Sequence, residues 1–297
     1  MKYLAALVIA LAAVPATARP QLAITFDDLP AHGPLPAGTT RLAVAQAVID
    51  ALKAARVGEV YGFVNGFLTE RAPDLPVLEL WRAAGLPVGN HGWSHLRLDD
   101  VGAAAATVDL DRNEPLVATL AGKTQWHWFR FPFLAEGNDP AMRLAFRHEL
   151  ATRGYRIAGV TMSFGDYLWN PAYARCVAKG DTAAIARLET SYLADAAETA
   201  TAARTDARSA YGRDTPYVLL MHIGAFDARM LPRLLAQYRR DGFAFTTLAK
   251  AESDPVYAAD VDPSLPPAAS LRERLQAMGK APAPRTDYAV ELATVCT

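Results

Sequence analysis

The sequence has only two cysteines in 297 residues, no internal repeats, and no low-complexity segments apart from alanine-rich stretches. It also lacks an excess of either charge, because 30 basic residues face 31 acidic ones and the formal net charge is -1. A balanced charge gives no electrostatic reason to expect nucleic acid or an anionic membrane surface as a partner. With 52% hydrophobic residues, the chain can bury a large core, and its length fits one large domain better than two small ones.

A single apolar run opens the chain: Lys2 precedes the stretch from Tyr3 to Val14, and small residues precede Arg19. This layout is typical of a secretory signal peptide, and the run is short for a membrane span. We therefore predict a signal peptide over residues 1–18, export to the periplasm or out of the cell, and no membrane anchor; a buried N-terminal helix is the alternative. In an oxidising compartment Cys176 and Cys296 are a plausible disulfide tying the C-terminal tail to the body, although both could equally be free and buried.

Short apolar segments alternate with amphipathic ones along most of the chain. We expect strands at residues 22–26, 60–64, 86–89, 127–131, 156–162, 217–222 and 243–247, and helices at 40–55, 75–84, 101–121, 140–154, 182–211 and 228–241. This alternation predicts parallel strands with right-handed helical crossovers, and seven units favour a distorted, incomplete (β/α)7 barrel of the α/β class. Prolines interrupt the pattern beyond residue 250. We therefore expect a catalytic domain over residues 19–252 and a C-terminal extension over 253–297, packed on that domain, with one short helix at 268–278.

Metal-binding side chains follow two of the predicted strands. Asp27 and Asp28 come after the first strand, and His91 and His95 come after the third. An Asp-Asp pair alone is usually a solvated turn or a helix cap, but the His-x-x-x-His spacing puts two rings on one side of a turn or helix. Since the carboxyl ends of barrel strands share one face, Asp28, His91 and His95 can hold one divalent ion. Two nitrogens and one oxygen suit zinc, with cobalt, nickel or manganese as alternatives.

Three further polar residues lie at the ends of later strands: Arg130, Asp166 and His222. Adjacent strand residues point apart, so Asp27 is expected to face away from the metal and to be free to take a proton from water. Arg130 beside that carboxylate would keep Asp27 ionised, and His222, with an ordinary pKa of about 6.5, can deliver a proton. The backbone N–H of Phe133 is a candidate donor to an oxyanion.

These segments resemble the five motifs of the polysaccharide deacetylase family, carbohydrate esterase family 4, which shares the chitooligosaccharide deacetylase homology domain. The resemblance spans about residues 21–249 and rests on Thr25-Phe26-Asp27-Asp28, His91-Gly92-Trp93-Ser94-His95, Arg130-Phe131-Pro132-Phe133, Asp166-Tyr167-Leu168-Trp169 and Leu219-Leu220-Met221-His222. It implies that Asp27 is the catalytic base and His222 the general acid. It also implies that Asp28, His91 and His95 are the metal ligands. By the same resemblance, Arg130 would tune the ionisation of Asp27, and Asp166 would orient or charge His222.

The chain departs from the family pattern at three places. Leu29-Pro30 follows the aspartate pair where the family usually has glycine, and it leads into a loop containing His32 that is expected to narrow the mouth of the site. Gly92 stands where serine or threonine is more common, which predicts one missing hydrogen bond near the ligands. Leu168 stands where an aspartate is common. The candidate substrate contacts are His32, for which a plain turn residue is the alternative, and the rings of Trp93, Phe133 and Trp169, which could stack on sugar faces or pack a lid.

Taken together, these features predict an exported, metal-dependent deacetylase that hydrolyses acetyl groups, N-acetyl in preference, from a polysaccharide or oligosaccharide, and that acts as a monomer. One alternative is a metal-dependent amidase acting on a small non-sugar C–N substrate. A second is a catalytically inactive glycan-binding relative. The presence of every ligand and of both the base and the acid candidate counts against the second alternative.

Overall fold

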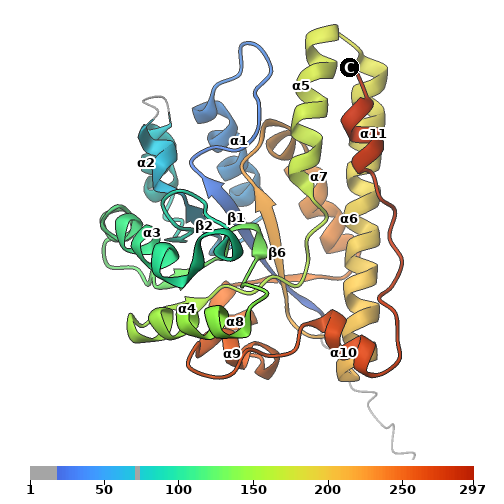
Figure 1. Ribbon diagram of the computed structural model, residues 1–297. Helices are drawn as coiled ribbons and strands as arrows, with labels where there is room; N and C mark the ends of the chain where they lie inside the picture. Colours follow the sequence, from blue (N-terminus) through green and yellow to red (C-terminus); the bar gives the residue numbers. More distant parts are fainter. Residues whose placement is uncertain (1–18, 71–73) are drawn as a thin grey trace, which may run out of the picture.

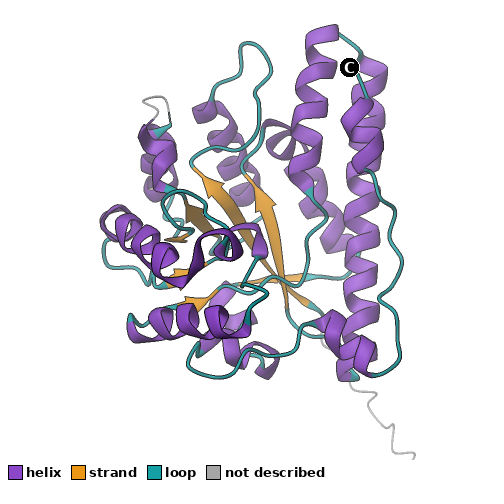
Figure 2. Ribbon diagram, in the orientation of Figure 1, coloured by secondary structure: helices purple, strands orange, loops and turns teal. Residues whose placement is uncertain are grey.

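A parallel sheet of seven strands lies at the centre of the molecule, and helices surround it (Figures 1 and 2). The structure, a computed structural model, describes residues 19–70 and 74–297, so the predicted signal peptide lies outside the described residues. The strands are β1 (Gln21–Leu29), β2 (Tyr61–Val64), β3 (Val88–Asn90), β4 (Trp128–Phe129), β5 (Arg156–Ile157), β6 (Tyr217–His222) and β7 (Ala244–Thr246). The helices are α1 (Arg41–Ala54), α2 (Leu75–Ala83), α3 (Leu98–Ala121), α4 (Pro140–Thr152), α5 (Trp169–Lys179), α6 (Thr182–Tyr211), α7 (Ala225–Arg240), α8 (Leu248–Ala251), α9 (Ala258–Val261), α10 (Leu271–Ala277) and α11 (Ala289–Thr294).

The sheet curls into an incomplete barrel, as the alternation of elements predicts. Its strand order is β5-β4-β3-β2-β1-β6, and β7 pairs with the first residues of β1. The two ends of the curl approach each other after β5, where Met162 makes a single parallel bridge to Leu219 of β6. We call this weakly paired junction the seam. Because no full strand fills the seam, the barrel stays open on that side.

The side chains of β1 alternate between two packing layers. Leu22, Ile24 and Phe26 are buried against the helices, whereas Ala23 packs inside the curl with the cluster that contains Phe63 and Trp128. A strand covered on both faces needs such a continuous apolar run. The same alternation puts Thr25 and Asp27 on the inner face, so the polar end of β1 opens into the barrel.

The second half of the barrel differs most from the prediction. The strands expected at residues 127–131 and 156–162 shrink to β4 and β5, because the chain after Ile157 turns toward the seam. Helix α5 was not predicted; it follows Gly165, which has the left-handed φ of 68°, and ends at Gly180 with φ 64°. Within the described parts of the chain, none of the helices has the length and apolar character needed to cross a membrane.

The C-terminal extension contains more helix than expected. Residues 253–297 form α9 and α11 as well as α10, which corresponds to the one predicted helix. Helix α10 packs on α6, and α11 packs on α5, so the extension runs along one side of the domain (Figure 1). Arg285 donates to Asp195 of α6 over 2.9 Å, and the Thr286 N–H donates to Glu198 over 3.0 Å. The extension is therefore held by polar contacts along its length.

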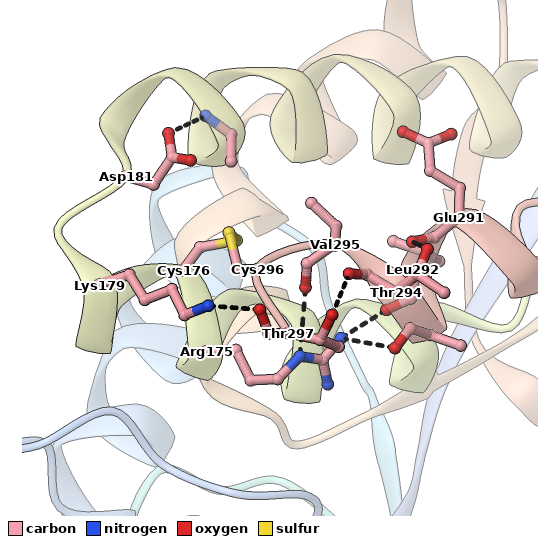
Figure 3. Close-up of a disulfide and its surroundings, with 12 residues drawn as sticks. Arg175, Cys176, Lys179, Asp181, Glu291, Leu292, Thr294, Val295, Cys296 and Thr297 are labelled. Carbon is pink, nitrogen blue, oxygen red and sulfur yellow. Dashed lines mark hydrogen bonds between the residues drawn. A yellow bond between two sulfur atoms is a disulfide. The ribbon is translucent and has the colours of Figure 1, made fainter.

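A disulfide fastens the far end of this extension. Cys176 of α5 is bonded to Cys296, 120 positions away in the sequence (Figure 3). Beside it, the Arg175 guanidinium donates to the carbonyl oxygens of Leu292, over 2.6 Å, and Val295, over 3.2 Å. Of the two alternatives for the cysteines, the structure therefore has the bonded pair.

Replacing both cysteines by serine is expected to lower the free energy of unfolding by about 2–4 kcal/mol, because a crosslink across a long loop restricts the unfolded chain. Urea unfolding of the C176S/C296S variant without reductant measures the loss. Wild-type protein in reductant serves as the control and should show the same midpoint as the variant. An unchanged midpoint in both samples would contradict the prediction.

Candidate active site

The end of β1 carries both aspartates of the first motif into one pocket. Asp27 is paired with His222 of β6 in the ladder, whereas Asp28 has the left-handed φ of 59° and lies where the register between β1 and β2 shifts. His91 Nε2 consequently lies 3.7 Å from Asp27 Oδ2 and 3.5 Å from Asp28 Oδ1. The expectation that the two carboxylates point apart is wrong, because it assumed a regular strand and the bulge at Asp28 turns its side chain back.

The predicted ligands Asp28, His91 and His95 form one compact group. Their donor atoms all lie within 4.8 Å of one another. His91 Nδ1–H donates to the Arg130 carbonyl oxygen over 2.7 Å, so its Nε2 presents a lone pair to Asp28. His95 Nε2 lies 3.3 Å from Asp28 Oδ1. That carboxylate oxygen is buried without a hydrogen-bond partner, which a bound cation would remedy, so the residues present fit a divalent ion.

The charge state of this group also suits a cation. Burial raises the pKa of Asp28, but the surrounding histidines, first among them His91, outweigh burial and hold that pKa below its ordinary value. Burial, with help from the neighbouring His91, lowers the pKa of His95 to about 4. A carboxylate beside a neutral imidazole is the form in which both side chains bind metal.

Asp27 is held by a buried ion pair with Arg130. Arg130 Nη1 lies 3.1 Å from Asp27 Oδ1 and 3.3 Å from Oδ2, and its other nitrogens donate to Thr25 Oγ1 over 3.1 Å and to the Ala158 carbonyl over 2.7 Å. The guanidinium also stacks 4.6 Å above the ring of Phe63. Asp27 is 2% exposed and Arg130 is 1% exposed. Such a fully bonded pair fixes the position of the Asp27 carboxylate.

His222 is oriented by Asp166, as the resemblance implied. The His222 backbone N–H donates to Asp166 Oδ2 over 2.6 Å, and the ring Nδ1 lies 2.9 Å from Asp166 Oδ1. Burial opposes the positive charge of the ring, but the Asp166 carboxylate outweighs burial and raises the pKa of His222 to about 9. The ring is therefore protonated at neutral pH, with Nε2 facing Asp28 at 3.9 Å from Oδ2.

A buried layer behind His222 was missed by sequence reasoning. Asp227 of α7 accepts hydrogen bonds from Asn170 over 2.7 Å and from the Tyr192 hydroxyl over 2.9 Å. Burial, together with the nearby Asp166, raises the pKa of Asp227 well above its usual range. In the sequence Asp227 looks like an ordinary acid in the first turn of a helix, so no pattern identified it.

The departure at Gly92 has a compensation in Asp109. The Asp109 carboxylate accepts from the Ser94 N–H over 3.0 Å, and its Oδ2 would lie 2.7 Å from a side chain added at Gly92, whose φ is 71°. A serine there would collide with this carboxylate and strain the backbone. The hydrogen bond expected to be missing near the ligands is thus supplied from α3.

A pocket of about 400 Å³ joins these residues. It contains the predicted base, acid and ligands together with His32, which the loop after β1 brings over Asp28 and His222. Sequence reasoning did not assign the rest of the wall, although Tyr167 and Leu220 lie inside the recognised motifs. The unassigned lining residues are Arg97, Leu134, Ser163, Tyr167 and Leu220.

The aromatic candidates for sugar stacking divide into two groups. Phe133 lines the pocket, is 55% exposed, and has its ring 4.4 Å from that of His95. Trp169 is fully buried against Tyr192 and Tyr288, so its predicted stacking on a sugar is corrected to core packing. Trp93 is not among the residues that line this pocket, and the Arg112 guanidinium lies 4.3 Å from the centre of its ring.

Comparisons with known proteins give one family match and several similar folds. Residues 15–152 match the model of the polysaccharide deacetylase family. No curated protein matches the chain in sequence. The fold is similar to a family 4 carbohydrate esterase from Streptomyces lividans solved with acetate (17% identity, covering 80% of this chain and 97% of that chain, TM-score 0.51). It is also similar to the peptidoglycan deacetylase PdaC from Bacillus subtilis (18%, 80% and 91%, TM-score 0.50).

A further match is a pseudoenzyme of the same esterase family from Bacillus anthracis (12% identity, covering 80% of this chain and 66% of that chain, TM-score 0.54). At these identities the likeness concerns the fold alone, so the relation to the family rests on the match of residues 15–152 to the family model. The family includes both esterases with deacetylase activity and inactive relatives. Residues 15–152 of this chain, which carry the first three of the five motifs, therefore match the polysaccharide deacetylase family.

Proposed function

We propose that this protein is a metal-dependent deacetylase that hydrolyses acetyl groups, N-acetyl in preference, from a polysaccharide or oligosaccharide. One observation carries the proposal: the group Asp28, His91 and His95 shares its pocket with a carboxylate fixed by Arg130 and a histidine charged by Asp166. Amide hydrolysis needs these groups together. A pseudoenzyme would be expected to lack at least one of them.

The chain's own residues divide the proton transfers between them. A divalent ion, zinc in preference to cobalt, nickel or manganese, would polarise the acetyl carbonyl and make water more acidic. Asp27 accepts a proton from the attacking water, and Arg130 holds its carboxylate in place. His222 Nε2 donates a proton to the leaving nitrogen as the C–N bond breaks, and Asp166 keeps the ring in that orientation. Water thereby adds to the carbonyl carbon, and acetate and an amine leave.

The shape around the pocket favours a long substrate over a small amide. A second cavity of about 640 Å³ shares Arg97, Phe133 and Leu134 with the catalytic pocket, so the two adjoin. It follows the seam and is walled on one side by residues 267–271 of the C-terminal extension. A small amide would need only the catalytic pocket, whereas a sugar chain needs room on both sides of the acetylated unit.

Filling this second cavity is expected to affect long substrates selectively. The Ala269→Trp variant puts a large ring in its wall, and we expect kcat/KM for an acetylated tetrasaccharide to fall about tenfold or more, since one blocked subsite removes a few kcal/mol of binding. Activity on a small acetyl ester should stay within about twofold. Val290→Trp, on the exposed side of α11, is the control and should change neither value. Equal losses on both substrates would count against a sugar-chain groove.

Acetate release decides between the candidate functions. The protein is incubated with acetylated oligosaccharides and with small amides, with and without a chelator, and zinc, cobalt, nickel or manganese is then added back. Chelator-sensitive acetate release from oligosaccharides is the expected result. Cleavage of small amides alone would favour the amidase, and glycan binding without any acetate would favour an inactive relative.

We also propose that the protein is exported and acts as a monomer. The disulfide between Cys176 and Cys296 supports an oxidising compartment. Mass spectrometry of the protein from its native cells should find a mature N-terminus near residue 19, and light scattering should give the mass of one chain. An unprocessed N-terminus in the cytoplasm would contradict the proposal.

A further inference from the structure

The histidines around Asp28 form two pairs, one on each oxygen of its carboxylate. Oδ1 faces His91 Nε2 at 3.5 Å and His95 Nε2 at 3.3 Å. Oδ2 faces His32 Nε2 at 3.6 Å and His222 Nε2 at 3.9 Å. The second pair comes from elements unrelated to the first: the loop after β1 and the end of β6. The carboxylate therefore has an imidazole pair on both of its sides.

The second pair meets the same spacing requirement as the first. The donor atoms of Asp28, His32 and His222 also lie within 4.8 Å of one another, as those of Asp28, His91 and His95 do. Two imidazole nitrogens and one carboxylate oxygen form a ligand set typical of zinc and related ions. Carboxylates commonly use their two oxygens to bridge a pair of ions, which then lie about 3.5–4 Å apart.

His32 is held in this position because Arg41 binds the backbone of the loop that carries it. Arg41 of α1 donates to the carbonyl oxygens of His32, over 2.8 Å, and Gly33, over 2.6 Å. Gly33 has φ 66° and packs against Asn170, where an added side chain would lie 3.1 Å from the Asn170 Cβ. The ring of His32 lies 4.6 Å from that of His222 and is buried far enough that its Nδ1 has no hydrogen-bond partner. The loop thus fixes the position of the ring, with Nε2 facing Asp28 and Nδ1 without a hydrogen-bond partner.

We propose that Asp28, His32 and His222 form a second divalent-cation site, with Asp28 bridging it to the first. His32 lies outside the five motifs, so this site depends on the loop in which the chain departs from its family. The second ion would occupy Nε2 of His222, because Asp166 already holds Nδ1 of that ring. The ion would displace the Nε2 proton of His222 into solvent, and the ring could not then serve as the general acid. Resting on the proposed function, the second ion therefore inhibits hydrolysis, and activity falls when the metal concentration exceeds what the first site needs.

Metal stoichiometry tests the site without reference to catalysis. The untagged apoprotein is dialysed against increasing free Zn²⁺, and bound zinc is measured by mass spectrometry of the digested sample. Wild-type protein should bind two equivalents, and the His32→Gln and His32→Ala variants should bind one, with a melting temperature near that of the wild type. His148→Gln, which changes an exposed histidine on α4, is the matched control and should still bind two. One equivalent in the wild type, or two in both His32 variants, would overturn the site.

The inhibitory role is tested separately by the ratio of activity at excess zinc to activity at one equivalent. We expect this ratio to fall below about one tenth in the wild type and to rise at least fivefold in His32→Gln. Full activity of the wild type with two bound equivalents would overturn the inhibitory role. A protein that binds two equivalents but releases no acetate even at one equivalent would refute the proposed deacetylase activity and leave the second site standing.

Discussion

The Asp27→Asn variant is expected to lose about 10²–10⁴-fold in kcat while its capacity to bind a divalent ion is unchanged, because a general base typically contributes that much to a proton transfer. The asparagine has nearly the same shape, and its oxygen can still accept from Arg130. It has no affinity for a proton at neutral pH. Turnover is measured by acetate release at saturating substrate, alongside metal content and melting temperature.

Two results would contradict this role. Activity within about threefold of the wild type would mean that another group takes the proton. Loss of the bound metal from the variant would mean that Asp27 is a ligand. Metal content is measured for this reason, since Asp27 Oδ2 lies 3.7 Å from His91 Nε2. Asp111→Asn is the control. The Asp111 carboxylate lies on the surface of α3, where it pairs with Arg153, and its replacement should leave turnover unchanged.

Replacing Arg130 by methionine is expected to lower the free energy of unfolding by about 3–5 kcal/mol, since it leaves Asp27 buried and unpaired. The substitution also removes the guanidinium as hydrogen-bond donor to Thr25 Oγ1 and to the Ala158 carbonyl oxygen. Urea unfolding at pH 7 measures the change. Arg112→Met removes a pair with Glu70 in which the side chains are 57% and 63% exposed, and it should cost under about 1 kcal/mol.

A double-mutant cycle separates the ion pair from simple loss of packing. In the Arg130→Met background, adding Asp27→Asn removes the unpaired charge. It should therefore lower the free energy of unfolding by about 1–3 kcal/mol less than the same substitution does in the wild type. Strict additivity of the two changes would show that the pair contributes little. Equal losses of unfolding free energy in Arg130→Met and Arg112→Met would also show that the buried pair contributes little.

The positions of the site residues along the chain could be predicted because they follow from strand ends. Parallel strands bring their carboxyl ends together, so Asp28, His91, Arg130 and His222 had to meet if the alternation was interpreted correctly. The apolar run of β1 and the histidine spacing are local signals of this kind. The family resemblance then supplied a role for each residue.

What could not be predicted depends on exceptions to regular geometry and on contacts between distant segments. The convergence of Asp27 and Asp28 arises from the positive φ of Asp28. Aspartate adopts a positive φ more often than most residues do, but too seldom for the sequence to predict it at one position. Trp169 appeared to be near the mouth, yet it is buried by Tyr192 and Tyr288, which come from later in the chain. Periodicity within a segment carries no information about which distant helix will cover it.

The seam also could not be predicted from the sequence. The segment from residue 156 to 162 was expected to be a full strand, but only two residues pair as β5 before the chain turns to meet β6 through Met162. The adjoining cavity exists because this strand is short. Whether a segment finishes its strand depends on its partners across the barrel, which no local pattern encodes.

The extension along the seam is anchored at both of its ends, by chain continuity after α8 and by the bond from Cys296 to α5. Reduction would release only the second anchor and would leave the strand ends that carry Asp27, Asp28 and His222 untouched. The wall that residues 267–271 give to the second cavity is held by the packing of α10 on α6, so it does not depend on the disulfide either.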